Sequence, residues 1–114
     1  MVRLTGVNDE PTKDWNLDRG LDALDEIGVK FVELRAVDGK NVDDLTDAEY
    51  DRVVETVTRR GFTVTGYDSN LGKCELNPDN WASEARRMKQ AIARTAMTNT
   101  PLIRTMGYRR GRGR

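Results

Sequence analysis

The chain alternates two hydrophobic periods along its length, and this alternation constrains its fold more than any other feature. Short β-prone runs occupy residues 2–7, 29–37, 62–67 and 102–106, and helical patterns lie between them. Strands that are separated by helices run parallel, with right-handed connections and with the helices packed on the sheet. We therefore predict an α/β fold of about four parallel strands and three helices, in the order β-α-β-α-β-α-β.

Start and stop signals bound the first two helices. Gly28 supplies a C-terminal stop to the first, whose apolar face consists of Leu17, Leu21, Leu24 and Ile27. Thr46 and Glu49 form a capping box at the start of the second helix, and Gly61 supplies its left-handed stop. The apolar face of this second helix consists of Tyr50, Val53, Val54 and Val57.

The third helix is predicted to begin near Asn77-Pro78-Asp79, and Pro101 bars its continuation. Its apolar stripe, the side that a helix of a globular protein turns to the core, consists of Trp81, Ala85, Met88 and Ile92.

The second strand favours a barrel over a doubly wound sheet. Glu33 and Arg35 share one strand face with Phe31, and the other face carries Val32, Leu34 and Ala36. A doubly wound sheet buries both faces under helices, whereas a barrel accepts polar side chains inside, near the carboxyl ends of its strands. Because a complete barrel takes about 250 residues and eight strands, we predict a partial (β/α)8 TIM barrel that is not closed. It would be a truncated half, one partner of a split or dimeric barrel, or an open sheet.

Three segments carry a family resemblance: GVKFVELRAVDGKNVDDLTDAEYDRVV (28–54), GFTVTGYDSNLGK (61–73) and TPLIRTMGY (100–108). They resemble the N-terminal half of bacterial sugar phosphate isomerases/epimerases of the xylose isomerase-like TIM barrel superfamily, so residues 1–108 would form that half. The resemblance implies metal-dependent isomerisation or epimerisation of a sugar or sugar phosphate. It also implies a divalent metal whose ligands, like the catalytic carboxylates, come from strands five to eight. We therefore assign no catalytic or metal-binding residue here, and expect this chain alone to bind no metal and to be inactive.

Five residues are predicted to contact a substrate in a completed barrel. Glu33, Arg35 and Arg104 would lie at the carboxyl ends of the second and fourth strands, and Ser69 and Lys73 in the loop after the third. A guanidinium group offers paired donors to the oxygens of a phosphate or carboxylate, which suits an anionic sugar. Under the alternative interpretation, Glu33 and Arg35 neutralise each other and the loop is an ordinary solvated one.

Missing residue types exclude several functions. The chain has no histidine, which excludes Ser-His-Asp triads and imidazole-bound zinc within it. Its single cysteine, Cys74, excludes an internal disulfide and any CxxC site. The stretch from Gly66 to Lys73 only superficially resembles a phosphate-binding P-loop, because its spacing is wrong and Cys74 follows Lys73.

An acidic run precedes and enters the second helix. Its spacing lacks the alternating oxygen ligands of an EF-hand, and carboxylates at a helix start oppose the helix dipole favourably. We therefore interpret as helix-capping the residues Asp38, Asp43, Asp44, Asp47, Glu49 and Asp51.

Charge is divided unevenly although 19 basic and 19 acidic residues cancel. Residues 1–57 carry 7 basic and 15 acidic groups, and residues 58–114 carry 12 basic and 4 acidic groups. A dipolar chain of this kind invites association with a complementary surface, another copy included, so a self-associating half-barrel that buries its open sheet edges is an alternative function.

The C-terminal residues 109–114 (RRGRGR) form a basic tail that we expect to be disordered. Together with the basic C-terminal half, this tail raises a third alternative, a weak nucleic-acid binder, but few aromatic residues nearby could stack on bases. We do not expect nucleic-acid binding. No signal peptide or membrane span is apparent, so the expected location is cytoplasmic.

Overall fold

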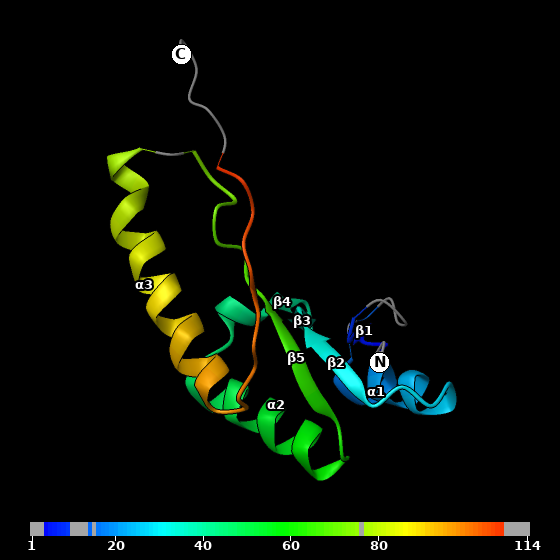
Figure 1. The fold of residues 1–114 in the computed structure, drawn as a ribbon. Coiled ribbons are helices and arrows are strands. Elements are labelled where there is room, and N and C mark those ends of the chain that lie inside the picture. Colours follow the sequence, from blue (N-terminus) through cyan, green and yellow to red (C-terminus); the bar gives the residue numbers. More distant parts are fainter. Residues whose placement is uncertain (1–3, 10–13, 15, 76, 109–114) are drawn as a thin grey trace.

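The centre of the molecule is a four-stranded parallel sheet in the order β1-β2-β5-β6, seen in the computed structural model (Figure 1). The structure describes residues 4–9, 14, 16–75 and 77–108. The four strands are β1 (Gly6–Val7), β2 (Phe31–Leu34), β5 (Thr63–Asp68) and β6 (Ile103–Arg104). They alternate with α1 (Leu17–Glu26), α2 (Asp47–Arg59) and α3 (Pro78–Ala96). The predicted α/β class, with four parallel strands, three helices and an unclosed sheet, is confirmed.

Local capping determines where the helices begin and end. Thr46 and Glu49 form the predicted reciprocal capping box of α2, and Asn77 caps α3 through its side chain, with Pro78 at the first helical position. Gly28 and Gly61 adopt positive φ angles of 76° and 80° just after α1 and α2, as predicted for left-handed stops.

The hydrophobic core lies on one face of the sheet, between the strands and the helices. Val32 and Leu34 of β2 are fully buried there, so Glu33 between them projects from the opposite face. Consecutive parallel strands with right-handed connections place their helices on the same side, so none of the helices among the described residues covers that opposite face. The core residues contributed by the three helices are Leu17, Leu21 and Leu24 of α1, Tyr50, Val53 and Val57 of α2, and Ala91 of α3.

The predicted strand 29–37 is shorter in the structure, because the chain leaves the sheet after Leu34. Ala36–Val37 (β3) pairs antiparallel with Lys40–Asn41 (β4), and a short 3-10 helix, η1 (Val42–Asp44), follows. Asp38 and Gly39 form the two-residue turn with φ angles of 50° and 83°, as a hairpin of this length requires. The hairpin therefore extends the β2–α2 connection over the carboxyl edge of the sheet.

The orientation of α3 differs from the prediction. Its apolar stripe is exposed, with Trp81 and Ile92 each retaining 56% of their accessible surface, while Arg94 and Thr95 are buried. Arg94 donates to the carbonyls of Val42 and Leu45 at 2.6 and 2.7 Å. The polar side of the helix faces the chain because these carbonyls require partners.

Gly72 is predicted to be required for the position of the β6 segment. Its φ is +83°, and a Cβ placed there would lie 2.0 Å from the Met106 carbonyl oxygen. We expect Gly72→Ala to lower the free energy of unfolding by about 2 kcal/mol, measured by urea denaturation, through backbone strain and this clash. Gly39→Ala is the matched control, since Gly39 has the same φ with nothing within 4 Å of its Cβ position. Equal losses in both variants would contradict the prediction.

Two expectations lie at the limits of what the structure describes. The basic tail, 109–114, lies outside the described residues. Within the described part of the chain, no helix is long and apolar enough to cross a membrane.

Candidate functional site

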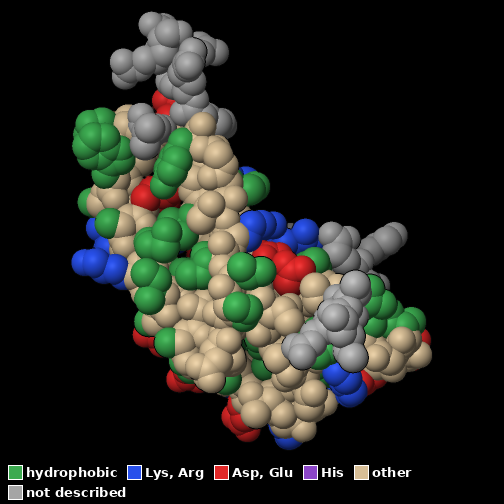
Figure 2. Space-filling model, in the orientation of Figure 1, with side chains coloured by type: hydrophobic (Ala, Val, Ile, Leu, Met, Phe, Trp, Pro, Cys, Tyr) green, Lys and Arg blue, Asp and Glu red, His purple; other side chains and the backbone are tan. Residues whose placement is uncertain are grey.

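A hollow of about 460 Å³ lies at the carboxyl edge of the sheet and gathers charged side chains of both signs. Figure 2 shows basic and acidic side chains side by side near the ends of β2 and β5. Three of the five residues predicted from the sequence line this hollow, namely Arg35, Lys73 and Arg104. The loops and the β3–β4 hairpin contribute others that the sequence reasoning did not single out, among them Asp9, Asn41 and Asn70.

Glu33 and Asp68 form a carboxyl pair on the helix-free face beside this hollow. The side chain of Glu33 lies over Gly66, where an added Cβ would be 3.0 Å from the Glu33 Cγ, so the glycine makes room for it. Burial raises the pKa of Asp68 to about 6, and the neighbouring Glu33 charge raises it further against the opposing effect of Arg104. Asp68 is a carboxyl group that keeps its proton into the mildly acidic range.

Arg35 is held in place by the β1–α1 loop. Its Nε donates to Asp9 Oδ2 at 2.9 Å, and its backbone N–H donates to Asn8 Oδ1 at 2.8 Å. Asn8 in turn donates to the Ala36 carbonyl at 2.6 Å. The Asp9 side chain is 2% exposed, and its Oδ1 has no hydrogen-bond partner among the described residues. The loop thus presents a buried carboxylate oxygen with an unused acceptor position beside the hollow.

Arg104, from β6, also lines the hollow. Its Nη2 donates to the Ser69 carbonyl at 3.3 Å, while its Nε is buried without a partner in the described part of the chain. A buried N–H without a partner costs free energy, so this donor is suited to a ligand oxygen.

Ser69 takes a different place from the other predicted residues. Its side chain is fully buried, its hydroxyl donates to Asp43 Oδ2 at 2.9 Å and it accepts from the Leu71 N–H. Ser69 therefore holds the loop after β5, and only its backbone carbonyl contacts Arg104.

Asp43 was interpreted as part of the capping run, but the structure makes it the centre of a buried network. It accepts from the side chains of Tyr67, Ser69 and Arg87 and from the Asn70 N–H. The capping interpretation is confirmed for Glu49, which completes the capping box, and Asp47 lies in the first turn of α2.

The acidic groups that the structure describes are not gathered as metal ligands. Among the described residues, no group of three or more Cys, His, Asp or Glu side chains is placed to hold a metal ion. Glu33 and Asp68 alone supply too few ligands for the divalent metal that the family resemblance implies.

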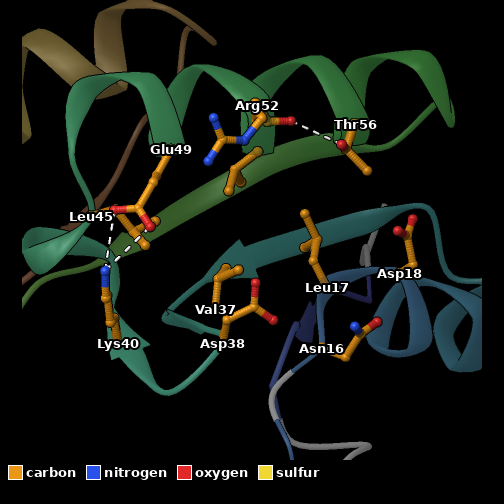
Figure 3. A pocket seen from close by; sticks show the side chains of 11 residues that line it. Asn16, Leu17, Asp18, Val37, Asp38, Lys40, Leu45, Glu49, Arg52 and Thr56 are labelled. Carbon is orange, nitrogen blue, oxygen red and sulfur yellow. Dashed lines mark hydrogen bonds and ion pairs between the residues drawn. The ribbon is translucent and has the colours of Figure 1, made fainter.

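A second hollow, of about 270 Å³, lies between α1, α2 and the β3–β4 hairpin (Figure 3). Three of its polar residues already have partners within the fold: Lys40 pairs with Glu49 at 3.2 Å, and Asn16 caps α1. None of the five predicted site residues lines it, so the carboxyl-edge hollow is the better candidate.

Comparison with protein-family models, with curated proteins and with solved structures gives no match to this chain in any of the three. The candidate site is therefore judged on its own geometry.

Proposed function

We propose that the carboxyl-edge hollow binds the anionic group of a sugar phosphate or a similar small sugar acid. In this proposal the chain supplies the N-terminal half of a xylose isomerase-like barrel, of the sugar phosphate isomerase/epimerase type. The observation that carries the proposal is the flanking of the Glu33–Asp68 pair by Arg35 and Arg104 at the carboxyl ends of parallel strands. In barrel enzymes that edge holds the active site.

The order of the strands supports the barrel part of the proposal. β1, β2, β5 and β6 are neighbours in the same order as in the sequence, and all are parallel. A doubly wound sheet instead reverses its strand order and places helices on both faces. A (β/α)8 barrel continues in one direction and keeps its inner face free of helices.

The charges support the ligand part of the proposal. Arg35, Lys73 and Arg104 line one hollow, and an arginine can offer two N–H groups to a phosphate. A carboxyl group with a pKa of about 6, such as that of Asp68, can exchange a proton with a bound hydroxyl group near neutral pH. We expect binding without turnover, since the resemblance places the metal ligands and catalytic carboxylates on strands five to eight.

Calorimetric titration with a hexose 6-phosphate, the unphosphorylated hexose and inorganic phosphate tests this function. Arg104→Gln and Lys73→Gln are each expected to weaken binding of the phosphate ester about tenfold, as loss of a charge-assisted hydrogen bond predicts. Lys89→Gln, an exposed substitution on α3 outside the hollow, is the control. Equal binding of the hexose and its phosphate, or an equal loss in the control, would contradict the proposal.

A further inference from the structure

An apolar surface lies exposed over α3 and the segment that carries β6. On α3 it comprises Trp81, Met88 and Ile92, which lie on one side of the helix, and on the following segment Leu102 and Met106. Figure 2 shows hydrophobic side chains gathered over these two neighbouring elements. Exposed apolar side chains that lie together on the surface of a small protein often mark a contact surface.

The strand β6 lies at the edge of the sheet, and part of its backbone has no neighbouring strand within the described chain. Leu102 accepts from Tyr67 N–H, and Met106 N–H donates to the Leu71 carbonyl, so these groups point towards β5 and its loop. Because backbone groups alternate between the two sides of a strand, the N–H groups of Ile103 and Thr105 point to the free edge. At the opposite end of the sheet, β1 pairs only with β2 within the described chain and leaves a second free edge.

We propose that two copies of this chain associate head to tail, with β6 of each beside β1 of the other. All four strands are parallel, so a two-fold axis along the strands joins both pairs of edges in the same parallel sense. Eight strands then form a closed ring, which removes every open edge. The helix-free faces of the two copies meet inside, and each brings its Glu33, Arg35, Asp68 and Arg104 to one shared cavity.

Charge complementarity supports a second copy of this chain as the partner that pairs with the free sheet edges. The half of the chain that contains β1 carries 7 basic and 15 acidic residues, and the half that contains β6 carries 12 basic and 4 acidic residues. Asp18, Asp22 and Asp25 of α1 pair with Arg60 of α2, so the complementarity rests on the net charges of the two halves. Head-to-tail contact opposes these net charges, whereas contact between two β6 edges would bring halves of the same sign together.

The single chain is less compact than a complete domain of the same length, as expected for half of a barrel. Its radius of gyration is 15.1 Å, whereas a compact domain of this length has about 13 Å. The inference does not depend on ligand binding, so the titration above and the association test below can fail separately.

Light scattering coupled to gel filtration, at micromolar concentration, tests the association. We expect a mass of twice 12.9 kDa for the wild type. Thr105→Pro removes an edge N–H and is expected to raise the dissociation constant about a hundredfold, with Thr105→Ala as its control. Ile92→Glu places a charge on the apolar surface and should also give monomers. Ala93→Glu, exposed on another side of the same helix, should leave the dimer intact.

Circular dichroism establishes that each variant is folded, and Ile92→Glu keeps the test decisive if Thr105→Pro does not fold. In about 1 M NaCl, where charges are screened within about 3 Å, the dimer is expected to weaken. A monomeric wild type would overturn the proposal, as would oligomers larger than two. A dimer that both Thr105→Pro and Ile92→Glu leave intact would overturn it as well, because the contact would then lie elsewhere.

Discussion

Replacement of Asp43 by alanine is expected to lower the free energy of unfolding by about 3–5 kcal/mol, because it removes a buried carboxylate that is the nearest counter-charge of the partly buried Arg87 and the acceptor for three further donors. The Asp43 side chain is 1% exposed, and its Oδ2 lies 2.9 Å from Arg87 Nη1. The remaining donors to its carboxylate are Tyr67 Oη at 3.0 Å, Ser69 Oγ at 2.9 Å and the Asn70 N–H at 2.8 Å. Burial and the Asp43 charge both raise the pKa of Tyr67, so its hydroxyl stays protonated and donates.

Asp44→Ala is the matched control for this prediction, since Asp44 is the next residue of η1 and its side chain is 58% exposed. It lies 3.9 Å from the same arginine, and its loss should cost less than about 1 kcal/mol. Asp43→Asn should fall between the two, because an amide oxygen still accepts hydrogen bonds but carries no charge. Urea denaturation at neutral pH measures all three. Similar losses for Asp43→Ala and Asp44→Ala would show that the network does not stabilise the fold.

The role of Asp43 was not predictable from the sequence. Composition shows only an acidic run before a helix, and for such a run dipole compensation is a sufficient explanation. The partners of Asp43 lie 24 to 44 residues away, on β5, its loop and α3. Only the fold brings them together, so no local pattern distinguishes Asp43 from its neighbour Asp44.

Local signals predicted the elements well because their causes are local. A capping box needs two side chains three residues apart, as Thr46 and Glu49 are, and a left-handed stop needs one glycine. The β3–β4 hairpin also had a local signal, Asp38-Gly39, a dipeptide typical of two-residue hairpin turns. The prediction missed the hairpin because residues 29–37, which are rich in β-branched residues, were interpreted as one continuous strand.

The orientation of α3 shows where periodicity reaches its limit. Periodicity identifies the residues that share a face of a helix, but the neighbours determine which face is buried. Here the carbonyls of Val42 and Leu45 are satisfied by Arg94, which turns the apolar stripe away from the chain. A stripe that was predicted as core became surface.

The candidate site was predictable in its strand residues and not in its loop residues. Alternation along β2 placed Glu33 and Arg35 on the face opposite Val32, and the structure agrees. Asp9 reaches the hollow from a loop whose course has no periodicity, so no pattern indicated it.

Between about pH 4 and 6 the free energy of unfolding is expected to fall as pH rises, because of Asp68. Its pKa is about 6 in the folded protein against an ordinary value of 3.8, so the folded state binds its proton more tightly than the unfolded state. The unfolded state therefore binds fewer protons in this window, and stability declines with increasing pH. At 1.36 kcal/mol for each pKa unit, the decline due to Asp68 is at most about 3 kcal/mol.

Asp68→Asn removes the titrating group and is expected to flatten this part of the curve and to raise stability at neutral pH. Glu33→Gln should move the midpoint of Asp68 downward, because the repulsion from a neighbouring carboxylate disappears while the burial remains. Asp51→Asn, at an exposed position of α2, should leave the curve unchanged and serves as the control. Carboxyl-carbon NMR titration measures the midpoint of Asp68 directly. A midpoint near 4 in the wild type would contradict this prediction, because Arg104 and Arg35 would then offset the effects of burial and of Glu33 on the pKa of Asp68.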